Sequence, residues 1–342
     1  MKKMNKLDNL NSYNYYLPNE LIATAPIMPK EEAKLLVYDR KNNSISHHKF
    51  GDLPEILPQC DIIFNDTKVI KARIYGTKQS GGKIELLINR PLSDGKFSVY
   101  IKGKVKPFDK LYFNENLIAK VLETLDDGSR IVEFYSGDKI LNLSEVFEIL
   151  NKIGHIPLPP YIKRDDTKDD EIWYQSVFAK HSGAVAAPTA SLHFSDEMLE
   201  ILRKQHEIYY LTLHVGAGTF KGVEFEDINK HIMHSEYFNI PNNTAEILKS
   251  NRPILGVGTT VTRVVEDYAR NHVLSGECKL FLNYKNRPIR QNYLLTNFHL
   301  PKSTLIMLVT AFIGYEKTME IYKVAVDEKY RFYSYGDAML VI

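Results

Sequence analysis

The stretch Leu294–Gly314, LLTNFHLPKSTLIMLVTAFIG, decides how we interpret the fold. Its opening leucines suit the end of a buried strand, and Leu305–Ile313 is apolar nearly all round, as in a helix enclosed by protein. Ser303 or Thr304 is typical of a helix start, because a hydroxyl there caps free backbone N–H groups. Gly314 is a natural stop. The stretch therefore predicts a strand, a polar loop and a buried helix.

The polar loop of this stretch contains Thr296, Asn297, His299 and Lys302. It would lie where the carboxyl end of a strand meets the amino end of a helix. In open α/β sheets that crevice binds ligands, and the helix end favours anionic groups. A capped core helix with an ordinary polar loop would look the same in sequence. We give the two interpretations equal weight.

The length and composition set the class of protein. A chain of 342 residues is expected to form two domains, because single cores stop growing at about 250–300 residues. Hydrophobic content of 44% and charged content of 25% are those of an ordinary globular protein. The formal charge of +2 gives no global nucleic-acid signal, so contact with RNA would need a local basic patch.

The cysteines and the amino-terminal segment indicate the compartment. Cys60 and Cys278 lie far apart and fit no metal or disulfide spacing, so we expect two free thiols. Residues 1–10 are rich in Lys and Asn and lack the apolar core of a signal peptide. No apolar run reaches the length of a membrane span. We therefore expect a cytoplasmic protein with no membrane contact.

The pattern of apolar and polar residues changes between residues 68 and 134. Short alternating runs such as KIELLINR, KFSVYIKG and RIVEFY are separated by SGG, SDG, NEN and DDG. Short strands with regular turn signals indicate a small antiparallel β-barrel. A proline-rich connector, GHIPLPPYIKRDD, follows. We predict a barrel domain at residues 67–151, inserted into a Rossmann-like α/β domain formed by residues 1–66 and 152–342.

The rest of the chain alternates between strand and helix patterns, which implies an α/β sheet. The expected strands are Ala33–Asp39, Asp61–Asn65, Ile208–Leu213, Pro253–Val257 and Lys279–Asn283. The expected helices are Leu17–Pro29, Ser144–Lys152, Asp196–His206, Thr244–Ser250 and Val261–Asn271. On the predicted barrel, Lys102, Lys104 and Lys106 form a basic stripe. It is either a phosphate contact or a set of solvated lysines that discourage aggregation.

Further polar clusters follow other predicted strands. The run LTLHVGAGTF contains neither GxGxxG nor GxxxxGK[ST], so we exclude a nicotinamide dinucleotide fold and a Walker-type ATPase. The run LGVGTTVTRVVE places Arg263 one turn into a helix, where it could hold an anion. In HIMHSE, the HxxH spacing lacks the HExxH pattern. A metal bound by His214, His231, His234 and His299 stays a minor alternative to proton transfer or hydrogen bonding by these imidazoles.

Several long motifs occur together in one order: FNDTKVIKAR, GGKIELL, GHIPLPPYIKR, GAVAAPTASLHF, LHVGAGTF, HIMHSEYF, VGTT, TNFHLPKSTL and YRFYSYGDAML. On these motifs the chain closely resembles the S-adenosylmethionine:tRNA ribosyltransferase-isomerases of queuosine biosynthesis. The resemblance runs almost from end to end. It implies an α/β domain with an inserted β-barrel, in agreement with the pattern of strands and helices.

The resemblance also implies the reaction. The ribosyl part of S-adenosylmethionine would be transferred to 7-aminomethyl-7-deazaguanine at the anticodon wobble position of tRNA. Isomerisation would then give epoxyqueuosine, with release of adenine and methionine. The implied partners are S-adenosylmethionine as co-substrate and the anticodon stem-loop, with no metal or redox cofactor. We expect a monomer.

The required chemistry selects candidate residues. A base must remove a ribose proton made acidic by the sulfonium, adenine must leave, and the acceptor amine must be neutral. Our candidates for proton transfer are His214, His234, Glu236 and Asp337. Arg263 and Lys302 are candidates for holding a carboxylate or phosphate. The other candidate substrate-binding residues are Asn65, Asp66, Thr67, Arg73, Thr189, His193, Thr219, Thr259, Thr296, Asn297, His299 and Tyr335.

The chain departs from the family pattern in four places. It has Lys30–Lys34 (KEEAK) in place of an Arg-Asp-x-Ser-Arg run, and Tyr284–Asn286 in place of Pro-Gly-Tyr. Asn292 stands at an expected Asp and Ser191 at an expected Gly. Three alternatives therefore stay open: a paralogue with another nucleoside acceptor, a methyltransferase, and a non-catalytic RNA-binding module.

Overall fold

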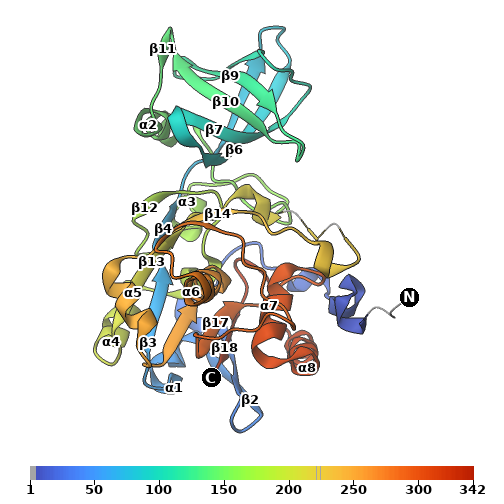
Figure 1. Ribbon diagram of the computed structural model, residues 1–342, viewed down its shortest axis with the longest axis vertical. Helices are drawn as coiled ribbons and strands as arrows, with labels where there is room; N and C mark the ends of the chain where they lie inside the picture. The colour runs from blue at the N-terminus through green and yellow to red at the C-terminus, as the bar shows by residue number, and fades with distance from the viewer. Residues whose placement is uncertain (1–4, 221, 224) are drawn as a thin grey trace.

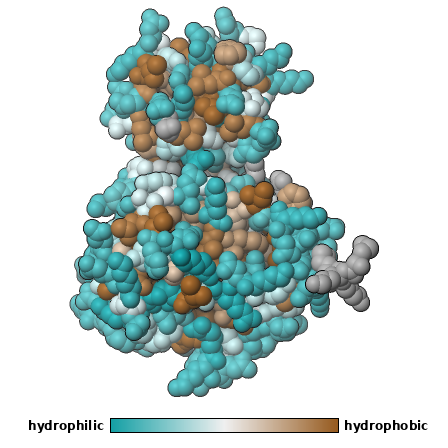
Figure 2. Space-filling view, viewed as in Figure 1, coloured by the Kyte–Doolittle hydropathy of each residue, from teal (hydrophilic) through white to brown (hydrophobic). Residues whose placement is uncertain are grey.

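The computed structural model describes residues 5–220, 222–223 and 225–342. A β-barrel lies at one end of the molecule and a larger α/β body at the other, and both ends of the chain belong to the larger body (Figure 1). The molecule narrows between the two parts, and mostly hydrophilic side chains cover the larger body (Figure 2). The predicted α/β domain with an inserted barrel is confirmed.

The larger body is built on a nine-stranded sheet. Its order is β16 (Ser275–Cys278), β14 (Glu236–Asn239), β13 (Ile208–Leu213), β3 (Asp61–Asn65), β15 (Ile254–Val257), β17 (Tyr293–Asn297), β18 (Ala338–Val341), β1 (Lys34–Asp39) and β2 (Ser44–Lys49). The neighbours β13, β3, β15 and β17 are parallel. Their carboxyl ends therefore meet at one edge of the sheet, and the polar connections that follow them lie together.

Helices cover both faces of this sheet because successive strand residues point to opposite sides. Leu294 joins the core under α7 (Thr304–Ile313) and α8 (Tyr315–Asp327), whereas Leu295 joins the core against α1 (Leu53–Ile56) and α4 (Asp196–Arg203). Two further helices, α5 (Asn242–Lys249) and α6 (Thr259–Asn271), enclose another core cluster with β13 and β14. No helix within the described ranges is long and apolar enough to span a membrane.

The stretch that began the sequence analysis folds as predicted. Strand β17 ends at Asn297, a polar loop follows, and Ser303 caps α7 by accepting a hydrogen bond from the Ile306 N–H at 3.3 Å. The middle of α7 is buried, and Gly314 ends the helix with a φ of 85°. A non-glycine residue rarely takes that conformation, so the glycine fixes where the helix stops.

The barrel consists of β5 (Arg73–Lys78), β6 (Lys83–Pro91), β7 (Lys96–Lys102), β8 (Lys110–Tyr112), β9 (Leu117–Thr124) and β10 (Arg130–Ser136), with the short β11 (Lys139–Ile140) beside β10. It closes because β10 pairs with both β7 and β9. Phe97 and Phe134 fill its core, and Val146 and Leu150 of α2 (Leu143–Ile153) join them. A capping box between Asn142 and Glu145 starts that helix.

The chain crosses between the barrel and the larger body twice, and the two crossings lie side by side. Arg73 and His155 form an antiparallel bridge, with the His155 N–H donating to the Arg73 carbonyl at 2.8 Å. Gly154 is required here, since a Cβ would lie 2.2 Å from the Lys71 carbonyl oxygen. Just before the first crossing, β4 (Thr67–Val69) pairs with β12 (His181–Ala184). The division at residues 67 and 151 remains our proposal.

Two predicted elements were wrong. The segment 17–29 contains only one short 3₁₀ turn, Asn19–Leu21, because its prolines lack N–H donors and favour extended backbone before them. The segment 279–283 forms no strand, and the strand in this region is Ser275–Cys278. The Leu280 carbonyl there accepts a hydrogen bond from Arg263 instead of pairing in the sheet. The expected free thiols Cys60 and Cys278 are both unpaired and buried.

Candidate functional site

The polar connections after the parallel strands are joined by hydrogen bonds. The Asn65 side chain accepts from the Leu213 N–H and donates to the Leu213 carbonyl, both at 3.0 Å, and so ties the ends of β3 and β13 together. Its amide also reaches the Thr260 hydroxyl at 3.4 Å, at the start of α6. The Thr67 hydroxyl is hydrogen-bonded to Nδ1 of His214 at 2.8 Å. Separate loops therefore form one polar floor.

A cleft with three adjoining cavities lies over this floor. The inner cavity, of about 80 Å³, is lined by the ends of β15 and β17 and by small residues from Ala186 to Ala190. The middle cavity, of about 310 Å³, lies between the segment 231–236 and the loop before α7. The outer cavity, of about 710 Å³, opens between the larger body and the barrel. The middle and outer cavities have the size of typical small-molecule sites.

Thr219 and Glu236 line all three cavities. Arg263 and Tyr333 join the inner cavity to the middle one, and His234 joins the middle cavity to the outer one. Two substrates bound in the inner and outer parts would therefore meet beside Thr219 and Glu236.

Glu236 is held by a dense set of donors. Its carboxylate forms an ion pair with Arg263 and accepts from the Gly216 N–H at 3.3 Å and the Thr219 hydroxyl at 3.5 Å. Arg263 also donates to the carbonyls of Cys278 and Leu280, at 3.3 and 3.1 Å. Burial lowers the pKa of Arg263, but the Glu236 carboxylate outweighs burial and the net shift is upward. The pair is thus a fixed buried charge pair at the junction of the cavities.

The imidazole rings of three site residues, His214, His234 and His299, are closely packed against their neighbours. Burial, with a smaller contribution from His181, lowers the pKa of His214 to about 4, and burial lowers that of His299 to about 3. Both rings are therefore neutral near pH 7. A Cβ on Gly218 would lie 2.7 Å from the ring of His234, so only glycine lets that ring approach the turn. Among the described residues, no group of three or more His, Cys, Asp or Glu could hold a metal ion.

Comparison with known proteins gives the family of this architecture. The sequence profile described as "Queuosine biosynthesis protein" matches residues 10–341. The chain belongs to this family. Proteins named S-adenosylmethionine:tRNA ribosyltransferase-isomerase are 62% identical to it in Campylobacter concisus and 63% in Campylobacter fetus, each over 99% of this chain and 100% of the relative. A crystal structure of S-adenosylmethionine tRNA ribosyltransferase from Thermotoga maritima matches 97% of this chain and 100% of that chain, with a TM-score of 0.54 and 30% identity.

Within this queuosine biosynthesis fold, most of the predicted site residues come together. Those that line the cleft are Thr189, His214, Thr219, His234, Glu236, Thr259, Arg263, Thr296, Asn297, His299 and Lys302. Asn65 and Thr67 lie beneath them in the polar floor. Asp66 accepts from the Thr212 hydroxyl at 2.6 Å and lies 3.6 Å from His181, so it supports the same floor.

The other four predicted residues belong neither to the linings of the three cavities nor to the polar floor. Asp337 is buried and accepts from the backbone N–H groups of Lys34 and Arg331, at 3.0 and 2.7 Å. Burial raises its pKa, and neither Lys34 nor Arg331 lines the three cavities. His193 stacks on Phe50, with ring centroids 4.8 Å apart.

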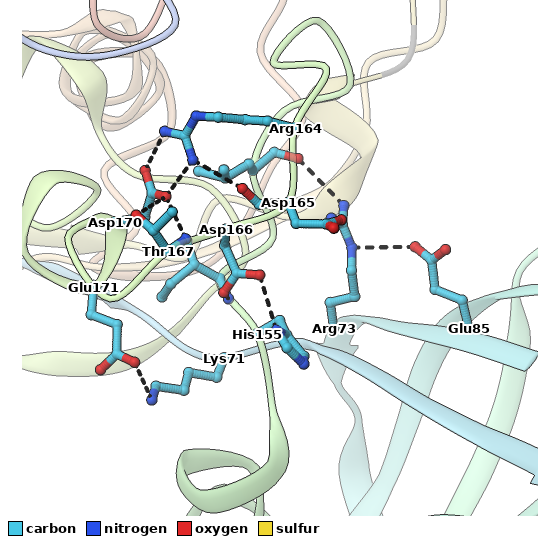
Figure 3. Close-up of polar contacts among 12 residues, drawn as sticks. Lys71, Arg73, Glu85, His155, Arg164, Asp165, Asp166, Thr167, Asp170 and Glu171 are labelled. Carbon is cyan, nitrogen blue, oxygen red and sulfur yellow. Dashed lines mark hydrogen bonds and ion pairs between the residues drawn. The ribbon is translucent and has the colours of Figure 1, made fainter.

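The other two residues are Arg73, which begins the barrel strand β5, and Tyr335, which lies between α8 and β18 of the larger body. Nε of Arg73 lies 3.2 Å from Glu85 and its terminal nitrogen donates to the Leu158 carbonyl at 3.4 Å (Figure 3). The Tyr335 hydroxyl donates to Asp170 at 3.0 Å. These contacts are structural, since each partner is part of the protein and none faces the cleft cavities.

Several residues that line the cleft are not among the predicted site residues. Tyr333 borders the inner and middle cavities, two residues before the predicted Tyr335. Its φ of 77° is unusual for a non-glycine residue and is the kind of feature found at functional sites, but it is visible only in the structure. Tyr237 and the barrel residues Asn89, Arg90, Tyr100 and Asp127 line the outer cavity. These residues face the cavity because of the position of the barrel relative to the larger body, and no short sequence motif predicts that position.

Proposed function

We infer that this chain transfers the ribosyl group of S-adenosylmethionine to tRNA and isomerises it, the reaction for which its relatives are named. The observation that carries this inference is the cleft itself. Its inner and outer parts are separate spaces that meet at Thr219 and Glu236, as a reaction between two large substrates requires. The acceptor is 7-aminomethyl-7-deazaguanine at the wobble position, the products are epoxyqueuosine, adenine and methionine, and S-adenosylmethionine is the co-substrate.

The inner cavity suits the adenine of S-adenosylmethionine. Ala186, Ala187 and Gly258 leave a narrow space, and Asn297 is 1% exposed with a side-chain oxygen that has no hydrogen-bond partner among the described residues. A buried acceptor of this kind is costly unless a ligand satisfies it. We propose that the Asn297 amide oxygen accepts a hydrogen bond from the adenine amino group.

The middle cavity then receives the methionine end of the donor. Lys302 lines it at the loop before α7, and a lysine ammonium there can hold the methionine carboxylate. The carboxylate would also lie near the amino end of that helix, where N–H groups favour an anion. This placement brings the ribose between the two ends, beside Thr219 and Glu236.

We assign proton transfer to residues at the junction. Glu236 is the proposed base for the ribose proton, and His234 is the proposed partner that passes protons between the two halves of the cleft. His214 lies in the outer part and is neutral, so it can form a hydrogen bond with the acceptor amine, which must be uncharged to attack. Asp337, the fourth predicted proton-transfer residue, lines none of these cavities, so we propose no contact between it and the substrates.

The competing functions are not favoured. A methyltransferase would use S-adenosylmethionine without releasing adenine, and an RNA-binding module would need no second, enclosed cavity beside its RNA site. The full-length relatives share one name, which argues against a paralogue with another acceptor. We propose a monomer that acts in the cytoplasm on the anticodon stem-loop and needs no cofactor beyond S-adenosylmethionine.

Adenine release tests the proposal. The protein is incubated with S-adenosylmethionine and an anticodon stem-loop that carries the aminomethyl base, and free adenine and S-adenosylhomocysteine are measured. Stoichiometric adenine is expected. S-adenosylhomocysteine without adenine would indicate methyl transfer, and RNA binding without turnover would indicate a binding module.

A further inference from the structure

We propose that the outer cavity is the subsite for the acceptor base, where Tyr237 stacks on the base and Asp127 of the barrel reads its hydrogen-bonding edge. This inference rests on the proposed function and extends it, because it makes the inserted barrel a determinant of base specificity.

The first observation is a row of side chains on one face of the sheet. In the pairing of β14 with β16, Tyr237 is opposite Glu277, and on its other side the Tyr237 carbonyl accepts from the His214 N–H at 2.9 Å. Residues opposite each other in antiparallel strands point to the same face. His214, Tyr237 and Glu277 therefore form one row, and all three line the outer cavity.

The second observation is the alternation along β14. Glu236 is 4% exposed, whereas the next residue, Tyr237, is 48% exposed. Neighbouring strand residues point to opposite faces, so Glu236 is held in its buried charge pair while the Tyr237 ring stays exposed in the outer cavity. The Tyr237 and His214 rings are nearly parallel, at 20° with centroids 6.2 Å apart. An exposed ring held in this way is a platform for a single unpaired base.

The third observation is that contacts to the body fix the barrel wall in place. The register of β6 against β7 shifts between Ile88 and Arg90, which makes Asn89 the extra residue of a bulge. Bulges redirect side chains. Asn89 accepts from the Ala217 N–H at 3.1 Å, and Arg90 forms an ion pair with Glu277. These two contacts join the barrel to the segment 216–219 and to the row formed by His214, Tyr237 and Glu277.

On this fixed wall, Tyr100 and Asp127 face the same cavity. The Tyr100 hydroxyl donates to Oδ2 of Asp127 at 3.4 Å, while the Ser129 N–H and hydroxyl donate to Oδ1 at 2.9 and 2.6 Å. The carboxylate is therefore oriented at one end by Ser129. Asp127 therefore presents a carboxylate of defined orientation to the same cavity as Tyr237.

The charge of the cavity identifies its ligand as a base and not a phosphate. Among the described residues of the lining, Asp127, Glu236 and Glu277 are acidic; Glu277 pairs with Arg90 and Glu236 with Arg263, so these pairs leave neither arginine unpaired for a phosphate. A guanine-type base offers adjacent N–H donors on its Watson–Crick edge, and a carboxylate accepts from both. The acidic lining also attracts an aminomethyl cation. A pyrimidine acceptor lacks this paired donor edge.

The test separates binding of RNA from binding of S-adenosylmethionine. Stem-loop affinity is measured by titration without S-adenosylmethionine, and S-adenosylmethionine affinity by calorimetry without RNA. Tyr237→Ala is expected to weaken stem-loop binding about 5- to 150-fold, the range for loss of one stacked base, and to leave S-adenosylmethionine affinity unchanged. Tyr237→Phe should restore binding, because it keeps the ring.

Tyr75→Ala is the matched control, since Tyr75 is also 48% exposed but lies on the barrel strand β5, outside this cavity. The second measurement compares the affinities for two stem-loops, one with a guanine-type wobble base and one with a pyrimidine. Asp127→Asn is expected to reduce the ratio of these two affinities. Equal loss of RNA affinity in Tyr75→Ala and Tyr237→Ala would overturn the proposal, as would an unchanged base preference in Asp127→Asn. Because the titration needs no turnover, it stays readable even if no adenine is released.

Discussion

Among the described residues, several buried carboxylates pair with arginines, and two of these pairs make a useful comparison because one lies in the cleft and the other does not. Glu236 pairs with Arg263 at the end of the large sheet, and Asp170 pairs with Arg164 in the connector to the barrel (Figure 3). The side chains of the two acids are 4% and 0% exposed. By burial and charge alone, the two pairs would rank equally as functional candidates.

Their surroundings differ. Asp170 accepts from the Thr167 N–H and hydroxyl and from the Tyr335 hydroxyl, so its carboxylate is bonded to groups that do not line the cleft. Burial raises its pKa, but the bonds from Arg164 and these groups outweigh burial and lower it. Glu236 instead borders all three cavities. Contact with a cavity, more than burial, therefore distinguishes the carboxylate that we propose to react from the one that we propose to be structural.

The strongest test of this contrast is the loss of each carboxylate. Glu236→Gln keeps the shape and removes the proposed base, so single-turnover adenine release should fall about 10²- to 10⁴-fold. Asp170→Asn should leave the rate per folded molecule near that of the parent, since it touches no cavity of the cleft. Equal losses in the two variants would show that the contrast is wrong.

A second test concerns stability. Asp170→Asn replaces an acceptor-only carboxylate with an amide among four donor groups, so we expect a loss of about 1–3 kcal/mol in the free energy of unfolding. Urea denaturation followed by circular dichroism measures it. Tyr335→Phe removes one of these donors and serves as the smaller control, about 1 kcal/mol. No change in Asp170→Asn would mean that the connector pair is not structural.

The sequence was informative where chemistry follows from local pattern. Parallel strands end at the same edge, so polar residues after predicted strands, such as His214, Thr259 and Asn297, could be expected to converge. Strand and helix types were recovered where apolar periodicity was strong, as in α7. The predicted helix at 17–29 and the predicted strand at 279–283 were wrong. Prolines interrupt the first segment, and in the second the Leu280 carbonyl accepts a hydrogen bond from Arg263 of α6.

The remaining site residues depended on long-range geometry. Tyr333 and Tyr335 are near neighbours in one aromatic run, yet only Tyr333 borders the cleft. Asn89 reaches Ala217 across 128 residues of sequence. A bulge and the closure of the barrel place it there, and neither leaves a signal in a single sequence. The sequence likewise does not show which residues pair with a buried charge, such as Arg164 and Tyr335 with Asp170.

The two regions should also differ in their response to acid. His299 in the inner cavity has its pKa lowered by burial to about 3, so the unfolded chain takes up a proton before the folded one. Its contribution to stability is complete above pH 6.5 and is lost as pH falls toward 3. Between pH 6.5 and 5.5 this loss should be about 1 kcal/mol. Urea titrations at the two pH values should show a smaller loss in His299→Gln, and an unchanged loss in Tyr335→Phe.

The smallest effect should come from the exposed edge of the connector. Asp166 accepts from His155 and from the Ile156 N–H, both at 2.9 Å, and the His155 side chain is 44% exposed. Exposed ion pairs contribute little, so His155→Gln should change the free energy of unfolding by less than about 1 kcal/mol and leave adenine release unchanged. Asp166→Asn should cost more than His155→Gln, because it also weakens the acceptor for a backbone N–H beside the crossing of the two chain segments. If His155→Gln instead reduced turnover while stability held, the connector would be coupled to the cleft, and the division between a reacting pair and a structural pair would no longer follow the cavities.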